Sequence, residues 1–520
     1  MRYWAARLAA RCRWRHRLAR YRILSLRSVR YFSEIGSMML DSLMEERVRK
    51  LRHLQALGFD AYPATVRRTA AIGKISDSFP AWSRGGKKVY VAARIKSLRD
   101  QGGIVFITIA DASGEIQAVL QKTNLKDFDL WKSSLDTGDF VEVGGTLFKT
   151  KRGEKSIEAK TLRLIVKALR PIPSEFYGLH NTETRLRKRY LDLLTHPELR
   201  DLFRRKNIFW KTIREFLTRE GFLEVDTPTL EATPGGADAE PFVTHHNALD
   251  TDFYLRISLE TALKKLLVGG YDKVFEIGRV FRNEGIDAEH LQDYTAMEFY
   301  LAYADHEDMM RLVERMYKEL VKAVCGSTIT VYDGKKIDWG KKWPKIDYYT
   351  IFREKTGLDL TGATREELFR KAQEKNLQPE RRSGRGRLID FIFKKTVRPE
   401  FIQPCFLTGH PLDISPLAKN DAKNPDKVLR FQVMAAGSEL GNGWAELNNP
   451  EEQRRRFGEQ MKLREAGDKE AQRLDEDFLE AMEYGMPPTA GFGLSERVFA
   501  VLMDKPIRET VFFPPMRRKD

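Results

Sequence analysis

Cysteine is scarce in this chain, which has only Cys12, Cys325 and Cys405 among 520 residues. There is no C-x-x-C pair and no H-E-x-x-H motif, so the sequence predicts neither a disulfide framework nor a zinc site. A reducing compartment, either the cytosol or the mitochondrial matrix, suits such a chain. No apolar run reaches the roughly 20 residues of a membrane-spanning helix, and we expect no membrane partner.

Acidic residues are missing from the first 33 positions, which hold ten arginines and no lysine. Removing these ten charges from the net charge of +16 leaves +6 for the remainder. Such a segment fits a transit peptide or a basic RNA-binding arm. It also fits upstream sequence that was wrongly joined to the protein, whose true start would then be Met38, Met39 or Met44. We favour the misassigned start, since serines are few, and interpret 1–43 as either that or a disordered extension. The expected location is cytoplasmic, or mitochondrial if the segment is a genuine transit peptide.

The length and the 42% apolar content allow two or three domains with ordinary cores. Residues 44–58 repeat apolar side chains at helical spacing, and 89–167 alternate in short runs separated by glycine. This pattern predicts an N-terminal helix followed by a small OB-type β-barrel. We expect this unit over 44–170 and a larger α+β unit over 171–520.

Within the larger unit, 199–220 reads as a long helix closed by Gly221. The pattern of residues 253–270 predicts a hairpin-like structure. The charge-rich stretch at about 320–395 has weak periodicity, which predicts a helical insertion rather than sheet.

The barrel segment has a basic side made of Lys149, Lys151, Arg152, Lys155 and Lys160. Phe106 falls in an expected strand, where an unpaired base could stack on its ring. The same ring could equally belong to the barrel core. The segment is therefore typical of a nucleic-acid-binding barrel but leaves the role of Phe106 open.

The most informative stretch is 274–303, where apolar alternation stops at an FRNEG turn and resumes at Tyr294, as in a hairpin of half-buried strands. Residues two apart share a face, so Glu298 should project with Tyr300, and Arg282 with Glu284. A guanidinium beside carboxylates suits a ligand with both phosphate and ammonium groups. A surface hairpin with cross-strand ion pairs fits this segment equally well.

Further segments point to a known family. FRNEG followed by MEFY resembles motif 2 of the class II aminoacyl-tRNA synthetases, and GFGLSERV (491–498) resembles motif 3. FLEVDTPTL (222–230) is similar to motif 1, whose proline lies at the family's dimer interface. Segments 233–250, 403–419 and 441–457 resemble the bacterial type of lysyl-tRNA synthetase in particular. The resemblance runs from about Met44 to Lys519, and colinear segments carry far more weight than one motif.

The resemblance implies an α+β fold, with an antiparallel six-stranded catalytic sheet flanked by helices and preceded by an OB-fold barrel that reads the anticodon. It implies that the carboxylate of L-lysine attacks the α-phosphate of ATP, and that tRNA(Lys) then takes the lysyl group from lysyl-adenylate. Mg²⁺ is the implied cofactor, ATP a substrate, and a homodimer the implied assembly. The family uses no side-chain nucleophile, so catalysis would depend on positioning and charge neutralisation.

The family's nucleotide-binding roles carry over to matching positions. Arg282 should bridge the lysine carboxylate and the α-phosphate, and Arg497 should lie over the adenine and reach the γ-phosphate. Glu284 should accept from the adenine amino group, and Tyr294 should stack on the base. His290 should approach the terminal phosphates. The resemblance thus makes Arg282 and Arg497 the catalytic residues.

The lysine-binding positions also match. Gly236 and Glu260 correspond to residues that hold the α-ammonium, and Asn442 to the residue on the carboxylate, together with Arg282. The remaining matches are Glu298, Tyr300 and Glu446 around the ε-ammonium and Trp444 as an aromatic wall. Paired carboxylates and a phenol would favour lysine over uncharged analogues. Arginine would be excluded by the length and the planar head group of its side chain.

Some positions depart from the family pattern. Glu439 matches a magnesium-binding carboxylate, but Gln432 stands where its partner carboxylate is usual, and an amide binds a hard cation more weakly. We therefore expect fewer ordered magnesium ions than is usual in the family, or magnesium binding that is mediated by water. Leu291 replaces an asparagine beside His290, and the segment before Arg497 is one residue shorter than usual.

In the barrel, Phe106 and Glu154 match anticodon-reading positions, and a base-contacting arginine aligns near Arg99. One alternative is a degenerate paralogue that binds RNA or lysylates a protein, although protein-lysylating relatives lack the barrel. Another is an aspartate or asparagine enzyme, which would need a cationic pocket where this chain has Glu298 and Glu446.

Overall fold

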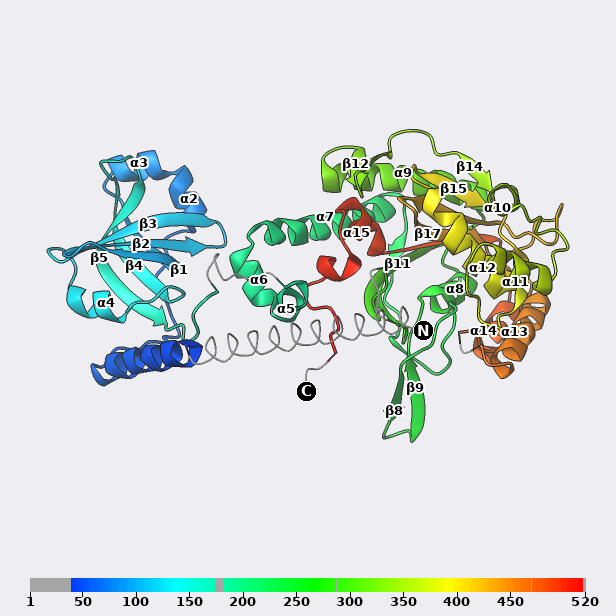
Figure 1. The fold of residues 1–520 in the computed structure, drawn as a ribbon, viewed down its shortest axis with the longest axis horizontal. Coiled ribbons are helices and arrows are strands. Elements are labelled where there is room, and N and C mark those ends of the chain that lie inside the picture. Colours follow the sequence, from blue (N-terminus) through cyan, green and yellow to red (C-terminus); the bar gives the residue numbers. More distant parts are fainter. Residues whose placement is uncertain (1–38, 174–178, 180, 286–288, 469, 518–520) are drawn as a thin grey trace, which may run out of the picture. The chain divides into compact units, whose positions relative to one another are not determined.

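The computed structural model describes residues 39–173, 179, 181–285, 289–468 and 470–517 (Figure 1). The chain divides into two compact units, Met1–Gly178 and Leu179–Asp520, which are described separately. This boundary lies slightly beyond the predicted one at 170. The ten arginines of residues 1–33 and the alternative start Met38 lie outside the described residues, whereas Met39 and Met44 fall within them. Among the described residues, no helix is long and apolar enough to cross a membrane.

The first unit opens with a helix over residues 39–56, followed by a closed β-barrel. The barrel strands are β1 (Lys88–Asp100), β2 (Ile104–Asp111), β3 (Gly114–Gln121), β4 (Phe140–Lys149) and β5 (Lys155–Val166), in the order β1-β2-β3-β5-β4. Short helices accompany them: α2 (Ile72–Asp77), α3 (Phe79–Arg84) and α4 (Phe128–Ser134). Val89, Val91 and Ile95 are fully buried because every second side chain of a strand points into the barrel. The predicted barrel is confirmed.

The second unit is built on a sheet that has eight strands in the described part of the chain. From edge to edge they are β14 (Lys345–Asp347), β15 (Cys405–Thr408), β16 (Arg430–Ala435), β17 (Ser438–Ala445), β18 (Thr489–Ser495), β11 (Asp293–Ala302), β10 (Lys273–Phe281) and β6 (Leu223–Glu224). The inner strands, from β15 to β10, pair antiparallel. The edge strands β14 and β6 pair parallel with their neighbours. The expected antiparallel sheet is thus present and carries a short parallel strand at each edge.

Helices cover the two faces of this sheet differently (Figure 1). Helices α7 (Glu198–Arg219) and α9 (His306–Cys325) pack on one face, where Phe299 and Phe492 join their apolar side chains. Helix α8 (Glu260–Val268) packs on the opposite face, where Tyr300 contacts its cluster. Since neighbouring residues of a strand face opposite sides, Phe299 enters the core while Tyr300 faces the other way.

The remaining elements surround this sheet. The helices are α5 (Thr182–Arg187), α6 (Arg189–Thr195), α10 (Tyr348–Thr356), α11 (Arg365–Glu374), α12 (Arg385–Thr396), α13 (Pro450–Glu465), α14 (Glu476–Glu483) and α15 (Arg497–Leu502). Short 3-10 turns are η2 (Arg398–Glu400), η3 (Leu412–Ile414) and η4 (Ile507–Thr510). Two small sheets pair β7 (Leu230–Glu231) with β9 (Thr251–Leu255) and β8 (Val243–His246), and β12 (Ile329–Tyr332) with β13 (Lys335–Asp338).

The stretch at 320–395 is only partly helical. Strands β12, β13 and β14 precede the helices α10 to α12. The β12–β13 hairpin turns at Asp333 and Gly334, which both have positive φ (48° and 71°). An Asp-Gly pair is a hairpin signal, and it outweighs the weak periodicity that favoured helix.

Residues 253–270 do not form a hairpin; they contain the end of β9 and the helix α8. Leu259, Leu263 and Leu267 are all buried, and their spacing of four is helical. Because this segment is a helix, Glu260 and Lys264 lie one turn apart on the same side of α8.

Candidate active site

A cavity of about 2330 Å³ lies in the second unit. Every site residue that the sequence predicted in this unit lines the cavity: Gly236, Glu260, Arg282, Glu284, His290, Tyr294, Glu298, Tyr300, Gln432, Glu439, Asn442, Trp444, Glu446 and Arg497. Segments more than 200 positions apart therefore meet in one site. We call the part around Glu260, Glu298 and Glu446 the carboxylate end, and the part around Arg282, Arg398 and Arg497 the guanidinium end.

Strand register explains how the cavity floor forms. Gln432 pairs with Asn442, Asn442 with Gly493, and Gly493 with Glu298 across β16, β17, β18 and β11. Two residues along, Trp444 pairs with Gly491 and Gly491 with Tyr300. Paired residues share a face of the sheet, so the polar side chains form rows separated by glycine.

The glycines of β18 keep the floor open. A Cβ atom on Gly491 would lie 2.4 Å from Glu446 Oε1 and 2.4 Å from Tyr300 Cε1. Any side chain at this position would collide with both groups. Gly491 therefore maintains the space that lies between the carboxylate and the phenol.

Glu298 is held by fixed donors. Its Oε1 accepts from Ser258 Oγ at 2.8 Å and from the backbone N–H of Leu259 at 3.0 Å. Its Oε2 accepts from the hydroxyl of Tyr300 at 3.0 Å. This contact confirms that Glu298 and Tyr300 project together, as predicted for one strand face.

Glu446 is almost completely buried, with 1% exposure. Its Oε2 accepts from Trp444 Nε1 at 2.7 Å and pairs with Lys264 Nζ at 2.5 Å. Its Oε1 is buried and has no hydrogen-bond partner. An unpaired buried carboxylate oxygen is costly, so this atom marks a place where a ligand's donor would be stabilised.

Burial governs the charges at this end. It raises the pKa of Glu260 and of Glu446 above the ordinary carboxyl range, although Lys264 opposes the rise. Burial also raises the pKa of Tyr300 well above its usual value, so the phenol stays neutral and can donate. Ammonium groups entering the cavity would therefore favour the ionised carboxylates.

Gly236 lies beside Glu260 in a left-handed conformation with φ of 81°. A Cβ here would approach Glu260 Cβ to 2.9 Å and Ser258 Cβ to 3.0 Å. A glycine is thus required both by the backbone conformation and by the neighbouring side chains.

At the guanidinium end, Arg282 follows β10 and donates from Nε to the carbonyl oxygen of Ile257 at 3.2 Å. Its guanidinium carbon lies 5.7 Å from the centre of the Tyr294 ring. Glu284 lines the same wall of the cavity. The backbone contact restrains the side-chain direction, and Arg282 lines the cavity, where a guanidinium suits an anion.

Arg497 begins α15 and donates to the carbonyl oxygen of Glu289 at 3.1 and 3.3 Å. Arg398 in η2 approaches the Glu289 carboxylate at 3.3 Å, while its own Nε is buried without a hydrogen-bond partner. Glu289 thus lies between two cationic side chains. The same arrangement would attract a phosphate chain.

The shortened segment before Arg497 keeps its place in the sheet. Ser495 still pairs with Ala296 on β11. Glu496 is fully buried, accepts from the backbone N–H of Thr295 at 3.3 Å and forms an ion pair with Lys206. These contacts hold the turn that delivers Arg497 to the cavity.

Leu291 also has a structural explanation. It is 5% exposed and packs with Ala500 and Ile507 in a small apolar cluster. A polar residue here would lose that packing. His290, its neighbour, lines the cavity.

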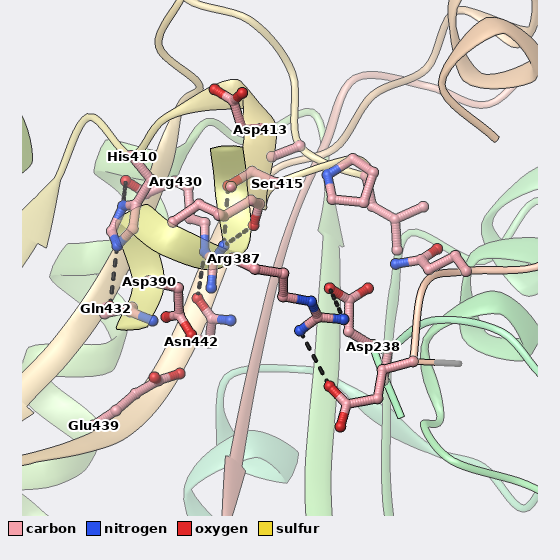
Figure 2. A pocket seen from close by; sticks show the side chains of 18 of the residues that line it. Asp238, Arg387, Asp390, His410, Asp413, Ser415, Arg430, Gln432, Glu439 and Asn442 are labelled. Carbon is pink, nitrogen blue, oxygen red and sulfur yellow. Dashed lines mark hydrogen bonds and ion pairs between the residues drawn. The ribbon is translucent and has the colours of Figure 1, made fainter. Parts of the chain in front are cut away.

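Gln432 and Glu439 share a wall of the cavity with Asp390 and His410 (Figure 2). His410 Nε2 lies 3.1 Å from Gln432 Oε1, and its Nδ1 lies 3.3 Å from the Arg430 carbonyl oxygen. Burial lowers the pKa of His410 to about 3, so the neutral ring has one N–H for these two acceptors. Rotating the Gln432 amide would satisfy both ring nitrogens and would turn the amide oxygen away from the histidine.

The donor set limits what metal this wall could hold. Within the described residues, no group of three or more His, Cys, Asp or Glu side chains could bind a metal ion. Magnesium commonly uses one or two carboxylates, waters and substrate phosphates rather than an all-protein cage. Glu439 with the Gln432 amide fits that mode and does not fit a closed metal site.

Three side chains at the site were not predicted from the sequence: Lys264, Arg398 and Arg430. Arg430 donates from Nε to Asn442 Oδ1 at 2.9 Å and is held by Ser415 Oγ at 2.9 Å (Figure 2). For Lys264, a Glu-x-x-x-Lys helical spacing was available as a signal. Arg398 had no local signal, because its partner lies more than 100 positions away.

In the first unit, Phe106 lies outside the barrel core. Its neighbours Val105 and Ile107 are fully buried, whereas Phe106 is half-buried on the alternate face of β2. Arg99 pairs directly with Phe106 across β1 and β2. Glu154 is exposed just before β5. The core alternative for Phe106 is therefore wrong, and its ring and Arg99 share one outer face.

Two family models match this chain. Residues 181–517 match tRNA synthetases class II (D, K and N), and residues 89–165 match the OB-fold nucleic acid binding domain. Curated relatives are similar along most of the chain. The lysine–tRNA ligase of Roseiflexus sp. (strain RS-1) is 45% identical over 93% of this chain and 100% of its own length. That of Moorella thermoacetica is 42% identical over 92% of this chain and 99% of its own length.

Proposed function

The chain belongs to the class II lysine–tRNA ligases, and from this membership we propose how its cavity attaches L-lysine to tRNA(Lys) with ATP. The carboxylate end would take the amino acid, and the guanidinium end would take the nucleotide. The reaction needs no side-chain nucleophile, because the lysine carboxylate itself attacks the α-phosphate. The protein then contributes position and charge.

The unpaired Oε1 of Glu446 is the observation that supports the lysine site best. We assign it, with Glu298 and Tyr300, to the ε-ammonium of the substrate. Glu260 and Gly236 would receive the α-ammonium. An uncharged analogue would leave Glu446 Oε1 buried and unsatisfied, which disfavours its binding.

The remaining substrate groups are assigned by chemistry. Asn442 would hold the lysine carboxylate, supported by the hydrogen bond that Arg430 donates to its amide oxygen. Trp444 would form an aromatic wall beside the aliphatic chain. Arg282 would contact both the carboxylate and the α-phosphate, where negative charge accumulates as the new bond forms.

For ATP, we assign Tyr294 to stacking on the adenine and Glu284 to its amino group. Arg497 would lie over the base and reach the γ-phosphate. His290 would contact the terminal phosphates. Their common position around one cavity supports these roles.

Mg²⁺ belongs to this proposal as the cofactor bound with ATP. Glu439 would hold it, and Gln432 would add an amide oxygen in place of a second carboxylate. The ion would neutralise phosphate charge when bound. Glu439 is the one carboxylate that we assign to the ion, so the phosphates and waters would supply most ligands.

We propose that the barrel binds the anticodon of tRNA(Lys) through Phe106, Glu154 and Arg99. The outward ring of Phe106 offers a stacking surface, and Arg99 beside it offers a cation. Residues 44–170 would form this domain and 171–520 the catalytic domain.

A homodimer is proposed through the segment that resembles motif 1. Leu223 and Leu230 in this segment are 47% and 44% exposed. Exposed apolar side chains on β6 and β7, the two short strands of this segment, suit burial against a second copy. Light scattering of the purified protein tests this assembly, and a monomeric mass under assay conditions would contradict it. A cytoplasmic location completes the proposal, since tRNA and ATP are the substrates.

Amino-acid-dependent ATP–pyrophosphate exchange tests the proposed function. We expect exchange with L-lysine alone among the standard amino acids, followed by lysylation of tRNA(Lys). Absence of lysine-dependent exchange, with the protein folded, would favour a degenerate RNA-binding paralogue. Lysylation of a protein in place of tRNA would favour the other alternative.

A further inference from the structure

Lys264 is buried behind the carboxylate end, with 1% exposure. Its Nζ forms an ion pair with Glu260 Oε1, one helical turn earlier, and with Glu446 Oε2 at 2.5 Å, far along the chain. Burial acts to lower the pKa of Lys264, but the two carboxylates outweigh it and the pKa is raised. One internal ammonium group therefore connects both carboxylates.

Lys264 is not among the residues that line the cavity, whereas Glu260 and Glu446 are. It approaches the two carboxylates from behind the cavity wall, from within α8. A substrate would therefore contact the glutamates and not this lysine. Lys264 must therefore act through the two carboxylates that it holds.

The atoms used by Lys264 define which atoms remain. On Glu446, Oε2 is occupied by Lys264 and by Trp444 Nε1, while Oε1 has no partner. Lys264 and Trp444 together fix the rotation of this carboxylate and direct its unpaired oxygen. Without the ammonium, only the Trp444 hydrogen bond would hold the carboxylate in this orientation.

Charge balance points the same way. Glu260, Glu298 and Glu446 contribute three negative charges when ionised, and Lys264 cancels one of them. The remaining two match the two ammonium groups of lysine. Buried charges are tolerated only when they are paired, so this balance favours a ligand with two cationic groups.

We infer that Lys264 selects for the length of the substrate side chain, because its single ammonium group fixes the positions of both Glu260 and Glu446, which we assign to the α- and ε-ammonium groups of lysine. The inference rests on the proposed lysine-binding function. It makes Lys264 a positioning residue for specificity rather than a catalytic one. Ornithine, shorter by one methylene group, could satisfy only one of the two carboxylates when their positions are fixed.

The experiment compares L-lysine with L-ornithine in pyrophosphate exchange for the full-length wild type, Lys264→Arg, Lys264→Met and the control Lys265→Met. Lys265 is the adjacent residue on α8 but pairs with Asp477 and is partly exposed. In Lys264→Arg the charge remains while the bridge changes length and shape. We expect the lysine-to-ornithine ratio of kcat/KM to fall about tenfold or more, mainly through a higher KM for lysine. Lys265→Met should keep the wild-type ratio.

Thermal unfolding followed by circular dichroism identifies folded variants. Lys264→Met leaves buried carboxylates without a partner and can fail to fold, in which event Lys264→Arg alone decides. A folded Lys264→Arg that loses activity equally with both amino acids would overturn the inference and indicate a structural role. An unchanged ratio would overturn it too. Wild-type protein without lysine-dependent exchange would instead refute the proposed function.

Discussion

The two ends of the cavity are built in contrasting ways. At the carboxylate end, Glu446 and Tyr300 are 1% and 3% exposed, and both oxygens of Glu298 accept hydrogen bonds from the protein. At the guanidinium end, Arg282 and Arg497 are only partly buried, and Glu289 provides an internal anion between cations. One end is more deeply buried, whereas the other is more exposed.

We attribute the difference to the two ligands proposed for these ends. Lysine must be distinguished from amino acids of similar size, which requires buried groups whose satisfaction depends on one ligand. ATP carries its own charges and, in the proposed function, arrives with a cation, so its site can be more open. The proposal therefore concentrates specificity at one end and charge neutralisation at the other.

The largest expected effect is at the carboxylate end. Glu446→Ala should lower kcat/KM for lysine in exchange by about a thousandfold or more, because it removes an ammonium partner and leaves Lys264 partly uncompensated. The exposed Glu480→Ala is a matched control that should behave as wild type. Wild-type exchange at unchanged lysine affinity would remove Glu446 from the site.

At the guanidinium end, Arg497→Ala should lower the rate of exchange by roughly a hundredfold, since a donor to developing phosphate charge is lost. The KM for lysine should change little. Arg454→Ala, on the exposed side of α13, serves as the control. A large rise in the KM for lysine would show that the two ends are not separate.

A change outside the cavity should spare both ends. Phe106→Ala should reduce tRNA charging by about tenfold, the range for loss of one stacked base, and leave exchange nearly intact. Thr108→Ala, on the same face of β2, controls for barrel stability. Equal losses in charging and exchange would argue for a packing role.

The proposed role of Gln432 in binding magnesium can be tested by substitution. Gln432→Glu should lower the magnesium concentration for half-maximal exchange severalfold, because a second carboxylate strengthens binding of a hard cation. Titration of exchange against Mg²⁺ measures this directly. An identical requirement in wild type and variant would contradict the proposed role of Gln432.

The smallest expected effect concerns pH. The raised pKa values of Glu260 and Glu446 mean that protons compete with ammonium groups at the carboxylate end. Lysine binds the ionised form, so its KM should fall severalfold as pH rises from about 6 to about 8. The KM for ATP should vary less over this range. A KM for lysine that rises with pH would contradict the binding of lysine to the ionised carboxylates.

Much of the site was predictable because its residues occur in local motifs. The 274–303 hairpin, the pairing of Glu298 with Tyr300 and the barrel all followed from strand alternation. The 253–270 segment was misinterpreted because its polar residues obscured the leucine spacing of α8. The short strands at 329–347 were missed because they are too brief for a periodic signal.

The sequence by itself determined the family, the barrel followed by the catalytic unit, and the kinds of side chain in the site. These depend on local patterns and on motifs whose order is preserved. Only the tertiary structure decided that Lys264 connects Glu260 to Glu446, that Arg398 meets Glu289, and that Phe106 lies outside the barrel core. Such contacts depend on strand register and helix packing, which bring distant residues together without any local trace in the chain.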